Sequence, residues 1–137
     1  MDFKNLLINA RNIVLYKIIE TIGVGIIILG LLFFISLITY SPNDPNFIFS
    51  ENKEIKNLLG FKGSLVSDFF FQAIGLVSFL IPLSIVITGV NVFFSKKLLI
   101  LFENLFFIVL YSIVGSLYLS LFYNKSFFLS IGGNGGF

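Results

Sequence analysis

The residues of this chain that could do chemistry are few, and most of the acidic ones lie between Ser41 and Asp68. That stretch contains Asp44, Glu51, Glu54 and Asp68, together with three lysines. The sequence has no histidine and no cysteine, which removes the commonest general base, a frequent metal ligand and the thiol nucleophile. None of the usual acid–base or nucleophilic arrangements can be assembled from what remains. We therefore expect no catalytic residue, no cofactor and no metal site.

Two further chemical functions are excluded by what the motifs lack. The chain ends in the glycine-rich stretch 131–137, but a phosphate-binding loop must finish in Gly-Lys-Ser or Gly-Lys-Thr, and neither occurs. The nine basic residues are scattered, never more than two adjacent, whereas a nucleic-acid-binding face needs a basic stripe or patch. We expect this chain to bind neither nucleotides nor nucleic acid directly.

Composition indicates that the chain folds in a lipid bilayer. Of its 137 residues, 57% are hydrophobic and only 12% are charged, too few charges to cover a soluble domain of this size. The uncharged run 21–40 would make about 30 Å of helix, which matches the thickness of the bilayer hydrocarbon. The lipid bilayer is therefore the expected partner of most of the surface.

The apolar pattern predicts an all-α integral membrane bundle, with three transmembrane helices preceded by an amphipathic interfacial helix. A cleavable signal peptide fits the N-terminal part poorly, because its apolar core is too long and no small-residue cleavage pattern precedes Ser41. The predicted elements are a cytoplasmic or interfacial helix (1–20), a first span (21–40), an extracytoplasmic loop (41–68), a second span (69–94), a cytoplasmic turn (95–103), a third span (104–124) and an extracytoplasmic glycine-rich tail (125–137).

Local signals add detail to the second span and its ends. Ser67 or Asp68 is a plausible N-cap for a helix that begins at 69, which gives Asp68 a structural role. Pro82 near the middle of the span is expected to kink it. Lys96 and Lys97 form a short basic turn, which Glu103 closes.

Small residues in the first span offer a face for close helix packing. Gly23, Gly25 and Gly30 would let a neighbouring helix approach, although the general tolerance of glycine in membrane helices explains them equally well.

The order and spacing of residues around the loop resemble those of a known family. The chain resembles the four-span N-terminal membrane region of the FtsK/SpoIIIE family of bacterial DNA translocases, roughly from residue 20 to residue 137. No single element of the pattern is specific, and the combined order carries the resemblance. The residues that carry it, and that we take as candidate structural or interaction residues, are Pro42, Asp44, Pro45, Asn57, Gly60, Gly63, Asp68, Gly75 and Pro82.

The resemblance implies a function and a set of partners. Such regions anchor the translocase in the bacterial inner membrane, localise it at the division septum and contact other division membrane proteins, and the family also implies self-association as a hexamer. The distant ATPase motor that moves DNA is absent from these residues. In the family a glycine-rich turn introduces the fourth span, so the chain is expected to be a fragment that ends before that span.

Lysine and arginine placement predicts the orientation. Lys4, Arg11 and Lys17 flank the first span, and Lys96 with Lys97 lies in the second connection, so these sides are expected to be cytoplasmic. The 41–68 loop and the C-terminal end are then extracytoplasmic. A small three-span channel, holin or transporter subunit is the alternative, although no charged residue lies within a span, as transport pathways usually require.

Overall fold

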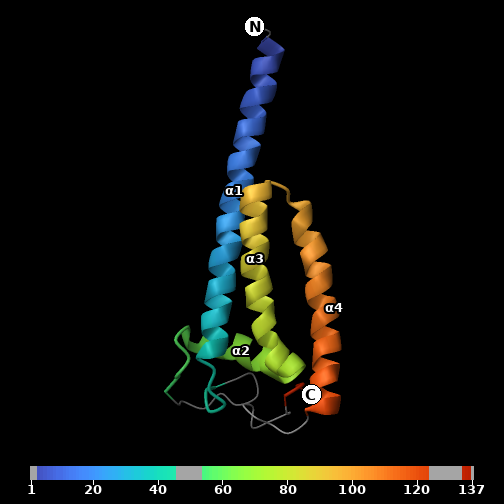
Figure 1. Ribbon diagram of the computed structural model, residues 1–137. Helices are drawn as coiled ribbons and strands as arrows, with labels where there is room; N and C mark the ends of the chain where they lie inside the picture. The colour runs from blue at the N-terminus through green and yellow to red at the C-terminus, as the bar shows by residue number, and fades with distance from the viewer. Residues whose placement is uncertain (1–2, 46–53, 124–133, 137) are drawn as a thin grey trace.

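The computed structural model describes residues 3–45, 54–123 and 134–136, and most of these residues lie in helices. Three helical stretches, Asn9–Ile38, Gly60–Ser95 and Leu99–Phe122, are long and apolar enough to cross a membrane. The prediction of an all-α membrane bundle with three spans is therefore confirmed. The elements in chain order are α1 (Phe3–Ile38), α2 (Gly60–Ile74), the 3-10 helix η1 (Gly75–Phe79), α3 (Leu80–Ser95) and α4 (Leu99–Phe122) (Figure 1).

Helix α1 is a single unbroken helix of 36 residues. At about 1.5 Å per residue it is roughly 54 Å long, well beyond the ~30 Å of bilayer hydrocarbon. Its N-terminal part accordingly projects past the ends of α3 and α4 (Figure 1). The sequence predicts two elements here, an interfacial helix and then a span, and the structure joins them. No glycine or proline falls between Phe3 and Glu20 to end the first element.

The stretch predicted as the second span divides into three elements. Helix α2 runs crosswise at the end of the bundle, and α3 then runs back alongside α1 (Figure 1). The direction changes at Gly75, whose φ of 60° and ψ of −138° are accessible mainly to glycine. Pro82 instead lies in the first turn of α3, where a missing backbone N–H matters least. The predicted kink at Pro82 is therefore wrong, and the break lies at Gly75–Phe79.

Helix α3 packs against α1 through small residues. A Cβ on Gly23 would lie 2.9 Å from the backbone nitrogen of Phe93, and one on Gly30 would lie 2.8 Å from Cγ2 of Val86. Close approach of this kind is how helices associate where burial of apolar surface from water no longer drives them together. The packing prediction holds for these two glycines and is wrong for Gly25, which has nothing within 4 Å.

Helix α4 follows α3 after a turn of only three residues, 96–98, and begins at Leu99 instead of at residue 104. Glu103 consequently lies inside α4 and does not close the turn. Within α4, all of which is described, Ser112 is the only buried residue. The remaining surface of α4 is largely apolar and exposed, as expected of a helix that faces lipid.

A buried hydrophobic cluster lies where α1, α2 and η1 meet. Leu37 and Phe71 are fully buried there. The rings of Phe71 and Phe79 meet edge to face, with 5.3 Å between their centroids. This cluster fixes the end of α1 against α2 and so positions the loop residues that join them. The partly buried side chains around it are Phe33, Tyr40, Phe70 and Phe79.

Candidate interaction site

The chain leaves α1 through a turn that Asp44 holds in place. The N–H of Asp44 donates to the carbonyl of Ser41 at 3.1 Å, with Pro42 at the second position of the turn, where its fixed φ suits the geometry. The Asp44 carboxylate, only 5% exposed, accepts the backbone N–H groups of Lys56 at 3.0 Å and Asn57 at 2.8 Å. Asp44 thus fastens the returning chain beside the end of α1.

The Asn57 side chain closes the same connection from the other side. Its amide donates to the carbonyls of Ser36 at 2.9 Å and Thr39 at 3.3 Å, and its Oδ1 accepts the N–H of Leu59 at 3.0 Å. The last carbonyls of a helix have no intrahelical partner, so Asn57 satisfies groups that α1 leaves open. Asn57 is 4% exposed, which makes it a structural tie and not a surface for a ligand.

Gly63 lies under Asn57 and permits this contact. A Cβ at Gly63 would lie 2.2 Å from Oδ1 of Asn57 and 2.6 Å from Cβ of Leu59. The carbonyl of Gly63 accepts hydrogen bonds from the hydroxyls of Ser36 at 2.7 Å and Ser67 at 2.9 Å. Gly63 is therefore the point at which α2 touches both α1 and the loop.

Gly60 and Pro45 complete the approach to α2. Gly60 begins the helix with a φ of 66°, in the left-handed region that favours glycine. The hydroxyl of Ser64 donates to the carbonyl of Pro45 at 3.0 Å, and both residues are buried. Nothing in the sequence marks Ser64 for this role, because a serine within an apolar helix is a common feature.

Asp68 is not an N-cap, because α2 begins at Gly60 and Asp68 lies in its interior. Its carboxylate accepts hydrogen bonds from the hydroxyl of Tyr40 at 3.2 Å and from Nε2 of Gln72 at 2.8 Å. Tyr40 lies just beyond the end of α1 with its ring against Phe71, 4.8 Å between centroids. Burial raises the pKa of Tyr40 well above its ordinary value, and the negative charge of Asp68 raises it further.

Gly75 and Pro82 lie apart from this loop network. The structure describes the glycine-rich tail only at 134–136, and there it packs beside Gly75, where an added Cβ would meet the carbonyl of Asn134 at 2.1 Å. The N–H of Leu76 donates to that carbonyl at 2.9 Å, and the Asn134 side chain donates to the carbonyl of Tyr123 at 2.9 Å. The tail thus joins η1 to the end of α4. The rest of the predicted 125–137 tail lies outside the described residues.

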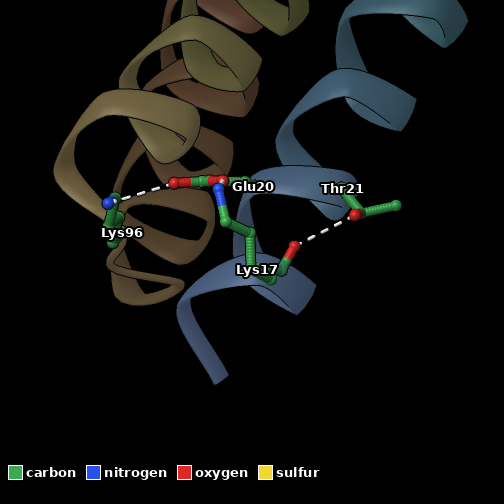
Figure 2. A network of polar contacts seen from close by, with 4 residues as sticks. All are labelled: Lys17, Glu20, Thr21 and Lys96. Atoms are coloured by element: carbon green, nitrogen blue, oxygen red, sulfur yellow. Dashed lines mark hydrogen bonds and ion pairs between the residues drawn. The ribbon is translucent and has the colours of Figure 1, made fainter. Parts of the chain in front are cut away.

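A second polar cluster ties α1 to the α3–α4 turn at the opposite end of the bundle (Figure 2). Glu20 of α1 pairs with Lys17 at 2.6 Å and with Lys96 at 3.0 Å, and the Lys96 ammonium lies 5.4 Å from the centroid of the Tyr16 ring. Lys96 adopts a φ of 54°, which lets the chain turn directly into α4. The sequence indicated a basic turn, but the partner of Lys96 could be found only from the fold.

The arrangement of these groups is suited to holding a shape. The polar side chains of the loop network bond to backbone groups of the chain itself. Among the described residues, no group of three or more acidic, histidine or cysteine side chains could hold a metal ion. Two large apolar side chains face outward beside the buried Asn57: Leu58 is 75% exposed and Phe61 is 46% exposed. The charged side chains of Glu54, Lys56 and Lys62 around them are exposed as well.

Fold and site together define a helical membrane domain in which an internal hydrogen-bond network holds the described residues between α1 and α2. The family model for the 4TM region of DNA translocase FtsK/SpoIIIE matches residues 17–137. The chain belongs to this family.

The chain matches only a small part of the length of the relatives to which it is similar, between 9% and 12% of each. The chain is 39% identical over 69 residues to the DNA translocase FtsK of Rickettsia prowazekii (strain Madrid E), which is 50% of this chain and 9% of the relative. It is 34% identical over 92 residues to that of Rickettsia typhi (strain ATCC VR-144 / Wilmington), 65% of this chain and 12% of the relative. It is 38% identical over 78 residues to the DNA translocase FtsK of Rickettsia bellii (strain RML369-C), which is 57% of this chain and 10% of the relative. No solved structure matches the chain.

Proposed function

We propose that this chain is the non-catalytic membrane region of an FtsK-like DNA translocase, which anchors the protein in the bacterial inner membrane and localises it at the division septum. The family match and three apolar helices support membrane anchoring. The observation that carries the localising role is the loop network. A loop that only connected two spans would not need a buried carboxylate and a buried amide to fix its shape.

The partners proposed for the loop are other membrane proteins of the division apparatus. Leu58 lies in the segment just before α2, and Phe61 lies in the first turn of α2. Hydrogen bonds hold this part of the chain against the end of α1. Apolar side chains on a pre-organised backbone lose less conformational entropy on binding a partner than they would on a flexible loop. Lys17 and Lys96, which pair with Glu20, lie at the end of the bundle opposite the loop. Lysines close to the ends of spans favour the cytoplasmic side, so they support a cytoplasmic N-terminus and an extracytoplasmic loop.

The test is the position of a fluorescent fusion of the chain in dividing bacteria. Enrichment at mid-cell is expected, and Leu58→Ala should reduce it while membrane insertion stays unchanged. Leu121→Ala is the matched control, because Leu121 on α4 is 77% exposed, close to the 75% of Leu58. Equal enrichment of all three proteins would show that this surface does not recognise the septum.

Two other results would reject the anchor role itself. Salt-sensitive DNA binding by the purified chain would contradict a region without a basic stripe. Uniform membrane distribution combined with ion leakage on overexpression would favour the channel alternative.

A further inference from the structure

Helix α2 has the reverse of the polarity expected of a helix that lies in water outside the membrane. Its buried side contains Ser64 and Ser67, 2% and 0% exposed, and both hydroxyls donate to carbonyls of the chain. The opposite side is open and apolar: Val66 is 41% exposed, Phe69 is 59% exposed, and the exposed Ala73 continues their three-to-four spacing. In water such a helix would turn its serines outward and its aromatic rings inward.

The position of α2 along α1 gives its depth in the membrane. The ion pairs of Glu20 mark one edge of the hydrocarbon, and about 30 Å of helix from there leads to Tyr40 at the far edge. The ring of Phe70 packs against that of Phe33, 4.7 Å between centroids. Phe33 is 13 residues beyond Glu20, about 20 Å along the axis, so this contact lies roughly 10 Å inside the far edge. Accordingly, α2 lies beside the last turns of α1 and not beyond them (Figure 1).

The exposed charge on the open side of α2, Lys62, lies toward the shallower end of the helix. Next to it, the carbonyl of Gly63 accepts a hydrogen bond from the hydroxyl of Ser36 at 2.7 Å. Ser36 is 16 residues beyond Glu20, about 24 Å along the axis, so this end of α2 lies closer to the far edge than the aromatic contact does. A lysine at this depth can keep its carbon stem in the hydrocarbon and its ammonium among lipid phosphates.

The crosswise direction of α2 limits what else could cover its open side. A further membrane-spanning helix would run along α1 and α3 and would cross α2 at one place (Figure 1). The open row from Lys62 to Ala73 instead extends about 17 Å along α2, in the plane of the membrane. A soluble partner would have to enter the hydrocarbon to reach the middle of this row. Acyl chains meet the whole row without either difficulty.

We propose that α2 is an interfacial helix embedded in the leaflet on the loop side of the membrane, and that its partner is phospholipid. Val66, Phe69 and Ala73 lie among the acyl chains, and Lys62 reaches the phosphates. The buried serines hold the other side of α2 to the chain, so no polar hydroxyl of this side faces lipid. The loop network that α2 carries is then held at the level of the headgroups.

The depth of α2 can be measured by fluorescence, since the chain contains no tryptophan. The purified chain is placed in vesicles whose phospholipids carry bromine either near the headgroup end or near the methyl end of the acyl chains. Phe69→Trp should be quenched more strongly by the first than by the second. Leu110→Trp, near the middle of α4, is the deep reference and should show the reverse order. Asn43→Trp, exposed in the turn beyond α1, is the water-side reference and should be quenched several-fold more by acrylamide than Phe69→Trp.

Val66→Trp is a second probe on the same side of α2 and should match Phe69→Trp, so a folding defect of one variant does not decide the result. Quenching of both by acrylamide to the extent seen for Asn43→Trp would place this side of α2 in water and overturn the proposal. Protection of both from acrylamide and from bromine would mean that protein covers this side, which would overturn it as well. The result is independent of the proposed septal role, because purified vesicles contain no division proteins.

Discussion

Replacing Gly63 by alanine should destabilise the fold severely, although it adds only one carbon atom. That carbon would lie 2.2 Å from Oδ1 of Asn57 and 2.6 Å from Cβ of Leu59. Both neighbours belong to the segment that Asp44 fastens, so neither can shift without weakening a hydrogen bond. Overpacking of this kind costs about 1–3 kcal/mol, and one weakened hydrogen bond adds about 1 kcal/mol. We expect a loss of roughly 2–4 kcal/mol, a large share of the stability of a typical domain.

The assay is unfolding of the protein in mild detergent by titration with dodecyl sulfate, followed by circular dichroism. Gly25→Ala is the matched control, since a Cβ there meets nothing within 4 Å and alanine favours the helix. Its transition should match that of the parent or shift slightly toward greater stability. Unfolding of Gly63→Ala and Gly25→Ala at the same dodecyl sulfate concentration would refute a packing role for Gly63 in the loop network.

Two further predictions concern pH and orientation. Because burial raises the pKa of Tyr40, the unfolded chain loses this proton near pH 10 while the folded chain keeps it, so the stability it confers is present below about pH 10 and is lost as the pH rises above that value. Tyr40→Phe should lack this decline when unfolding is measured from about pH 8 to about pH 11, and parallel declines would contradict the assignment. For orientation, a reporter active only outside the cytoplasm should work when fused after Glu54 or Phe137 and fail after Lys97. Activity at Lys97 with silence at Glu54 would reverse the proposed topology.

Much of the candidate site could be identified from the sequence, but the roles of its members could not. Asp44, Asn57 and Gly63 stand out as polar or small residues at fixed intervals, and the structure brings them together at the end of α1. The uncharged run that begins at residue 69 predicts a helix cap at Ser67 or Asp68, yet α2 begins at Gly60 and both residues lie inside it. Asp68 has a different partner. It faces Tyr40 instead, and that pairing joins residues 28 positions apart.

The sequence by itself determined that the chain folds in a membrane and that it folds as helices. Hydropathy is a sum over neighbouring residues, so the sequence alone reveals which stretches enter the membrane. Within lipid each backbone N–H and C=O needs a hydrogen-bond partner in the chain, and a helix supplies these partners locally.

Tertiary structure alone decided where those helices turn. Pro82 carried the strongest local signal for a bend, yet the bend lies at Gly75, where the carbonyl of Asn134 approaches too closely for any side chain. The partner of Lys96 is Glu20, 76 positions earlier in the chain. Contacts of this kind depend on which distant backbones come together, and the energy that selects them appears only after the helices have packed.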